Sequence, residues 1–156
     1  MSAAYSPDGK RLASASGDQM LKLWDATNGH KIKTLNGHTG PVQRVSLSPD
    51  GNRLASASSD HSVKVWDATS GEPILTLIGH TDTVNGVAFS PDGKLLASAS
   101  SDHKLKAWDA TSGQQILTLM GHTCTVTCVA FSPDWKQLAS VSEDHSVKVW
   151  NVTPPP

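Results

Sequence analysis

The chain has 156 residues, of which 37% are hydrophobic and 17% charged, and its formal net charge is −1. This balance is unlike the basic surface of a nucleic-acid-binding protein, and no apolar run approaches the about 20 residues that a membrane-spanning helix needs. The sequence therefore predicts a globular domain, or part of one, with neither nucleic acid nor membrane as a partner.

The chain contains an internal repeat with a period of 42 residues. Ser-Pro-Asp recurs at this spacing, beginning at Ser6, Ser48, Ser90 and Ser132. A tryptophan followed by Asp or Asn keeps the same register, at Trp24, Trp66, Trp108 and Trp150. The spacing therefore predicts one segment of repeats covering 1–156, with repeats at about 1–37, 38–79, 80–121 and 122–156.

Each repeat is predicted to form four short strands. In the second repeat the β-rich runs fall at 42–47, 54–58, 62–66 and 73–77. The turn after the first run is Ser-Pro-Asp-Gly, in which Pro presets the turn and Gly51 supplies a positive φ. Turn signals recur too often for a helix. Because one such sheet cannot bury both faces, we expect successive sheets to stack.

These features resemble the WD-repeat β-propeller family, in which Gly-His, Asp and Trp-Asp recur at this period. The resemblance covers the whole chain. It implies an all-β fold of nearly four antiparallel blades, each with four strands named a to d from the central channel outward. The last blade would lack its outer strand, and strand c at 146–150 would be its edge.

The resemblance also implies a hydrogen-bonded tetrad of His, Ser, Asp and Trp in each blade. A buried indole, hydroxyl and imidazole each need a partner, and a carboxylate can end the chain of donors. The complete sets would be His38, Ser56, Asp60 and Trp66; His80, Ser98, Asp102 and Trp108; and His122, Ser140, Asp144 and Trp150. The first repeat supplies Ser14, Asp18 and Trp24, while its histidine would precede residue 1.

Two other patterns of residues could indicate chemistry. The recurring Ser, His and Asp resemble a hydrolase triad, but they recur in each complete repeat with a Trp and without a nucleophile elbow, so we interpret them as structural. A second histidine series, His61, His103 and His145, falls on turns of different repeats, and these side chains should lie too far apart to share a metal ion. We expect a protein that is not an enzyme and needs no metal or cofactor. Recurring lysines such as Lys106 should extend a solvated tip over an apolar stem.

The start of strand a differs between repeats, in contrast to the nearly identical turns. In the family these positions line the top face around the channel, and here they are Gln43, Arg44, Asn85, Gly86, Thr127 and Cys128. The resemblance implies a non-enzymatic scaffold that binds a peptide or protein partner there. The alternative is a structural or assembly unit, or a fragment of a larger repeat protein, without its own ligand.

Four full repeats would need 168 residues, 12 more than the chain has. Because WD propellers close with about six to eight blades, we expect two chains to form an eight-bladed ring as a homodimer. A four-bladed monomer remains the alternative. Cys124 and Cys128 would lie roughly 13 Å apart on a strand, too far for a disulfide, which indicates a reducing, cytoplasmic location.

Overall fold

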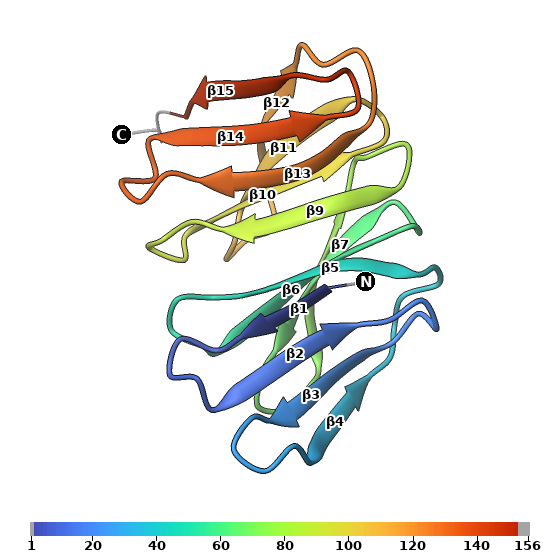
Figure 1. Ribbon diagram of the computed structural model, residues 1–156, viewed down its shortest axis with the longest axis vertical. Coiled ribbons are helices and arrows are strands. Elements are labelled where there is room, and N and C mark those ends of the chain that lie inside the picture. Colours follow the sequence, from blue (N-terminus) through green and yellow to red (C-terminus); the bar gives the residue numbers. More distant parts are fainter. Residues whose placement is uncertain (1, 153–156) are drawn as a thin grey trace.

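The computed structural model describes residues 2–152 and contains four antiparallel sheets, which confirms the predicted all-β fold. Figure 1 shows the sheets following one another in chain order along the long axis of the molecule. Within each sheet the strands also lie in sequence order, as expected for meanders with tight turns. No helix in the described range is long and apolar enough to cross a membrane.

Three sheets have four strands and the last has three. Blade 1 consists of β1 (Ser2–Tyr5), β2 (Arg11–Ala15), β3 (Leu21–Asp25) and β4 (Lys31–Leu35). Blade 2 consists of β5 (Val42–Leu47), β6 (Arg53–Ser58), β7 (Ser62–Asp67) and β8 (Pro73–Ile78). Blade 3 consists of β9 (Val84–Phe89), β10 (Leu95–Ser100), β11 (Lys104–Asp109) and β12 (Gln115–Met120). Blade 4 consists of β13 (Val126–Phe131), β14 (Gln137–Ser142) and β15 (Val147–Asn151).

The predicted strands agree with these bounds to within one residue. Strand β5 has the predicted bounds, whereas β6, β7 and β8 are each one residue longer than predicted. The predicted edge strand at 146–150 is wrong by one residue, because β15 begins at Val147 and pairs to Asn151 opposite Gln137. Residues 153–156 of the fourth repeat and Met1 lie outside the described residues.

Neighbouring blades pack face to face, and small residues allow the close approach. We call the side of a blade that meets the preceding blade its N-side face, and the other side its C-side face. The C-side face of blade 1 includes Ala13, Ala15 and Leu21, which pack against Leu54 and Trp66 on the N-side face of blade 2. The same positions form the other two interfaces. The core is therefore three separate layers between four sheets.

The two outermost faces of this stack are exposed. Val147 and Val149 on the C-side face of blade 4 are 67% and 61% exposed, whereas the equivalent Leu105 of blade 3 is fully buried. On the N-side face of blade 1, Tyr5 is 66% exposed and Trp24 is half-buried. The chain thus forms an open stack, and the two faces that a four-bladed monomer would bring together remain in solvent.

Arginine side chains form hydrogen bonds across two of the three blade junctions, a feature that no repeat motif predicts. Arg11 of blade 1 donates to the carbonyls of Ala68 and Gly51 in blade 2, at 3.1 and 3.3 Å. Arg53 of blade 2 donates to Ala110 and Gly93 in blade 3, both at 2.7 Å. Its guanidinium also lies 5.4 Å from the Phe89 ring centroid. Blade 3 has Leu95 at this position, so the third junction depends on apolar packing without the clamp.

We predict that Arg53→Ala lowers the free energy of unfolding by about 1–3 kcal/mol, because two partly buried carbonyls lose a charged donor. Arg11→Ala should have a smaller effect, since its hydrogen bonds are longer. Urea unfolding followed by circular dichroism measures both. Lys94→Ala, which removes an exposed cation nearby, is the control and should change stability by no more than about 0.5 kcal/mol. Equal stabilities for the Arg53 and Lys94 variants would contradict the clamp.

Candidate interaction surface and its supporting framework

Four side chains form a hydrogen-bonded network on the N-side face of the second blade. The indole Nε1 of Trp66 donates to Ser56 Oγ at 2.9 Å, and Ser56 Oγ lies 2.7 Å from His38 Nε2. The other ring nitrogen, His38 Nδ1, lies 2.7 Å from Asp60 Oδ2. A neutral imidazole protonated at Nδ1 donates to the Asp60 carboxylate and accepts at Nε2 from the Ser56 hydroxyl, which in turn accepts from the Trp66 indole. The carboxylate terminates the chain of donors.

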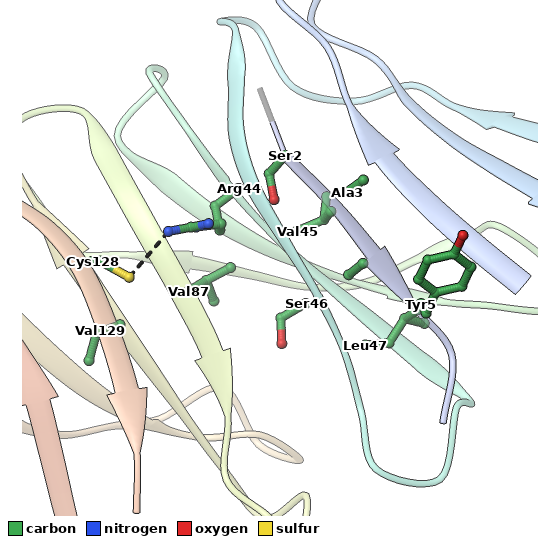
Figure 2. A pocket seen from close by; sticks show the side chains of 11 residues that line it. Ser2, Ala3, Tyr5, Arg44, Val45, Ser46, Leu47, Val87, Cys128 and Val129 are labelled. Carbon is green, nitrogen blue, oxygen red and sulfur yellow. Dashed lines mark hydrogen bonds between the residues drawn. The ribbon is translucent and has the colours of Figure 1, made fainter. Parts of the chain in front are cut away.

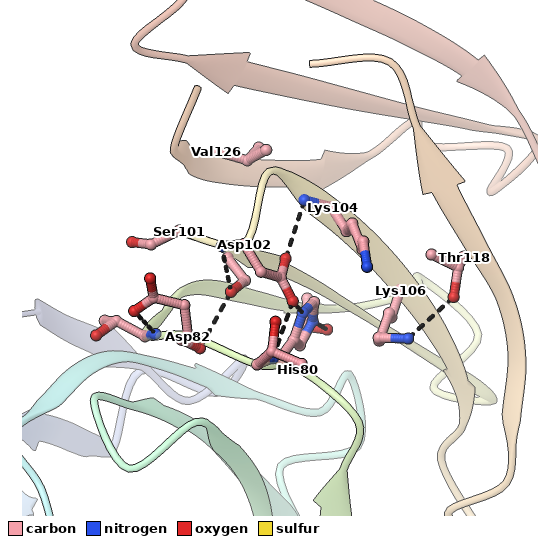
Figure 3. A network of polar contacts seen from close by, with 12 residues as sticks. His80, Asp82, Ser101, Asp102, Lys104, Lys106, Thr118 and Val126 are labelled. Atoms are coloured by element: carbon pink, nitrogen blue, oxygen red, sulfur yellow. Dashed lines mark hydrogen bonds and ion pairs between the residues drawn. The ribbon is translucent and has the colours of Figure 1, made fainter. Parts of the chain in front are cut away.

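The third and fourth blades contain the same arrangement. His80 contacts Ser98 and Asp102 at 2.7 and 2.8 Å, and Trp108 donates to Ser98. Figure 3 shows His80 and Asp102 within the polar network of blade 3. The fourth set is linked by contacts of 2.7 to 2.8 Å and comprises His122, Ser140, Asp144 and Trp150. In blade 1, Trp24 donates to Ser14 at 2.9 Å, whereas Asp18 is exposed.

Burial and hydrogen bonding set the charge states in these networks. Burial lowers the pKa of His38 and of His80, and the neighbouring aspartate only partly opposes this shift. Burial would raise the pKa of Asp60, but hydrogen bonds from Ser62, His38 and the Thr39 amide outweigh it and lower the pKa to about 2. A neutral imidazole beside an ionised carboxylate is thus the state that the folded protein favours.

The same networks are poorly suited to catalysis. Ser56, Ser98 and Ser140 are fully buried, and each hydroxyl accepts a hydrogen bond from a tryptophan. A nucleophile must reach a substrate, and these hydroxyls have no access to solvent. The geometry therefore supports a structural role for the three side chains.

The second histidine series occupies backbone turns. His61, His103 and His145 have φ values of 70°, 69° and 64°, and Gln19 has 72° at the equivalent position of blade 1. All four side chains are exposed. Within residues 2–152, no group of three or more His, Cys, Asp or Glu side chains is arranged to hold a metal ion.

Lys106 differs from the prediction for the recurring lysines. Its side chain is buried, and its Nζ donates to Gln115 Oε1 at 2.8 Å and to Thr118 Oγ1 at 3.0 Å. The prediction of a solvated tip is wrong here, because polar side chains of β12 replace water around the ammonium group. Burial accordingly lowers the pKa of Lys106.

The inner strands of the four blades border a groove with a volume of ≈ 410 Å³. Its lining comes from β1, β5, β9 and β13, and Figure 2 shows Arg44 reaching from β5 toward Cys128 on β13. The Arg44 Nη2 to Cys128 Sγ distance is 3.2 Å. Ser2, Tyr5 and Val129 also line the groove. These three residues were not among the predicted positions, although they lie on the same inner strands.

The predicted top-face residues differ in how they are held. Gln43 donates to Ser59 Oγ at 2.7 Å, and Asn85 donates to Ser101 Oγ and to the Val126 carbonyl at 3.0 and 3.1 Å. Thr127 donates to the Val141 carbonyl at 3.2 Å. Gly86 is buried, and a Cβ there would lie 3.3 Å from Cys128 Cα. Of the six residues, only Arg44 and Cys128 line the groove.

The repeat architecture is matched by comparison with known proteins. The family described as "WD domain, G-beta repeat" matches four times, at residues 1–25, 29–67, 71–109 and 113–151. The chain belongs to this WD40 family, whose members are generally non-catalytic and act in protein interactions.

Curated relatives match over roughly one repeat. The Nuclear distribution protein PAC1 of Arthroderma benhamiae is 54% identical over 37 residues, which is 24% of this chain and 8% of that protein. WD repeat-containing protein 82 of Drosophila melanogaster is 46% identical over 44 residues, 28% of this chain and 14% of that protein. The probable serine/threonine-protein kinase PkwA of Thermomonospora curvata is 47% identical over 36 residues, which is 23% of this chain and 5% of that protein. The matched segment is thus a small part of each relative.

We predict that acid destabilises the protein in two stages. His38 and His80 have folded pKa values below the ordinary 6.5, so below that pH the unfolded chain binds more protons and stability falls. Asp60 contributes stability above pH 3.8 that is lost as the pH falls toward 2. Urea midpoints measured from pH 7 to pH 3 test this. His38→Asn should lower stability at pH 7 and flatten the dependence between pH 7 and 5, and a wild-type midpoint constant over that range would contradict neutral buried imidazoles.

Proposed function

We propose that this chain is a non-enzymatic scaffold that binds a peptide or protein partner on the top face, where the inner strands begin. The observation that carries the proposal is the environment of Arg44. Its only hydrogen-bond acceptor among the described residues is the Cys128 sulfur, a weak acceptor, and none of the ion pairs in that part of the chain includes it. A cation beside an open groove is available to a carboxylate of a partner.

The surrounding residues support recognition of a polypeptide. Gln43, Asn85 and Thr127 retain hydrogen-bonding capacity beyond the contacts described above, and their identities differ from blade to blade. The blades that present them have nearly identical buried positions. We therefore assign the nearly identical buried positions a role in folding. Gln43, Asn85 and Thr127, together with Gly86 and Cys128, are assigned a role in partner selection. A net charge of −1 and two free cysteines favour a protein partner in the cytoplasm over nucleic acid or a membrane surface.

We predict that peptides selected from a displayed random library on this chain lose binding to Arg44→Glu and Asn85→Ala variants. For Arg44→Glu a loss of tenfold or more is expected, because the charge is reversed at a partly buried site. Isothermal titration calorimetry measures the affinities, and circular dichroism checks that each variant is folded. Lys136→Glu makes the same charge change at an exposed turn and should leave binding unchanged. Peptides that bind all variants equally would contradict the top-face site.

An assembly role is supported by a separate observation, the exposed outermost faces. We propose that two chains form an eight-bladed ring, with the C-side face of blade 4 packed on the N-side face of blade 1 of the other chain. Val141 and Val149 occupy the positions of Ala15 and Leu23, which are 5% and 1% exposed within blade 1. Burial of such apolar faces is the main driving force for association. Each contact would repeat a type of interface that the chain already contains three times.

We predict that light scattering at micromolar concentration gives about twice the chain mass of 16.5 kDa. Val141→Lys should shift the mass to that of one chain, because it places a charge in the proposed seam. Ile78→Lys is the matched control, since Ile78 is 78% exposed on the outer strand of blade 2. A wild-type protein that stays a single chain at these concentrations would overturn the ring.

A further inference from the structure

A second groove, with a volume of ≈ 370 Å³, lies where the loop leaving blade 1 meets the outer half of blade 2. We call it the lateral groove. The loop contributes Gly37 and Thr39 to its lining, and blade 2 contributes Ser62 and Lys64 of β7 and Ile78 of β8. No residue of the inner strands lines it. The lateral groove is therefore separate from the top-face site.

Lys64 is the cation of the lateral groove, and most of its donors are free. Its Nζ donates to Thr76 Oγ1 at 2.9 Å, whereas an ammonium group has three donors. None of the ion pairs within residues 2–152 includes Lys64, while the equivalent Lys22 of blade 1 is paired with Asp18 at 3.5 Å. Two N–H groups of Lys64 are thus available to an anionic group.

The carboxylate of Asp60 also lines the lateral groove, but its oxygens are already occupied. Oδ1 accepts from the amide and the hydroxyl of Ser62, at 3.0 and 2.6 Å. Oδ2 accepts from His38 Nδ1 and from the Thr39 amide, at 2.7 and 3.0 Å. Four donors use the acceptor sites of the carboxylate, so a cationic ligand finds no free oxygen there. The groove therefore favours an anionic ligand.

The lateral groove is open because the outer strand of blade 2 begins with Pro73, where blade 3 has Gln115. In blade 3 the Gln115 side chain accepts from Lys106 at 2.8 Å, and a Cβ on Gly79 would lie 3.0 Å from Gln115 Oε1. A Cβ on Gly37, the equivalent glycine beside blade 2, would meet only an indole within 4 Å. A proline cannot supply the amide that covers the lysine in blade 3.

The spacing of the groove residues matches an extended peptide. Ser62 pairs with Ile78 and Lys64 pairs with Thr76 across the β7–β8 ladder, so Lys64 and Ile78 are diagonal neighbours on one face of the sheet. Such neighbours lie about 7–8 Å apart. Side chains two positions apart in an extended chain are about 7 Å from each other. Ile78 is largely exposed and offers an apolar contact beside the cation.

We propose that the lateral groove binds an extended acidic segment of a protein partner that carries an apolar residue and an Asp or Glu two positions apart. The carboxylate pairs with Lys64 Nζ, and the apolar side chain covers Ile78. Every residue of this site belongs to one chain, so the site depends neither on the top-face site nor on the number of chains in an assembly.

The peptide acetyl-Thr-Leu-Thr-Glu-Thr-amide, titrated into the ¹⁵N-labelled full chain and followed by NMR, tests the site. We expect saturable shifts of the Lys64 and Ile78 amides at millimolar peptide. Lys64→Ala should weaken binding about two- to fivefold, as expected for a partly exposed ion pair, and so should Gln in place of the peptide Glu. Lys22→Ala removes a lysine that is already paired with an aspartate and should leave the affinity unchanged.

Pro73→Gln separates a defined site from general attraction to lysine. It places an amide beside Lys64 as in blade 3 and leaves the net charge unchanged, so binding should weaken by a similar factor. Circular dichroism checks that the variants are folded. Equal affinities of the wild type, Lys64→Ala and Pro73→Gln would overturn the proposal. Shifts confined to Arg44 and Cys128 that vanish in Arg44→Glu would also overturn it, while supporting the top-face site.

Discussion

Burial of both faces of every sheet is the constraint on which this molecule depends. A four-stranded meander has two apolar faces, and each must be covered by a neighbour. The central strands use small residues for this purpose: Ala55 and Ala57 of β6 have no exposed surface. Because the C-side face of one blade packs against the N-side face of the next, stacking the repeats buries every face except the two outermost ones. Those faces keep their apolar side chains in solvent.

Polar contacts make this stacking specific. In each of the last three blades, the loop that leaves the preceding blade carries a histidine into contact with a buried serine and an aspartate. An unpaired hydroxyl or imidazole in such a layer would be costly, so the blades are held in one register. No buried side-chain nitrogen or oxygen in the described range lacks a partner. The networks therefore connect consecutive repeats rather than act as reaction centres.

The inner strands are where the repeats differ, and the difference has a physical basis. Residues on the sheet faces must fit an interface of constant geometry, whereas side chains at the start of β5, β9 and β13 line the groove or form hydrogen bonds with their own or the next blade. Arg44 and Cys128 approach each other across the groove, although they lie two blades apart. A surface assembled from several blades can thus vary without disturbing the layers between them. The proposed binding site uses this freedom.

The sequence by itself determined the repeat, the strand count of the first three blades and the recurring positions of His, Ser, Asp and Trp. Local turn chemistry and a strict 42-residue period carry that information. Only the tertiary structure decided that Arg53 bridges two blades, that Lys106 is buried, and that Gly86 lies close to the backbone of Cys128. These contacts depend on the distance and rotation between sheets, which no local pattern encodes. The same geometry leaves the apolar side chains of the two outermost faces exposed to solvent.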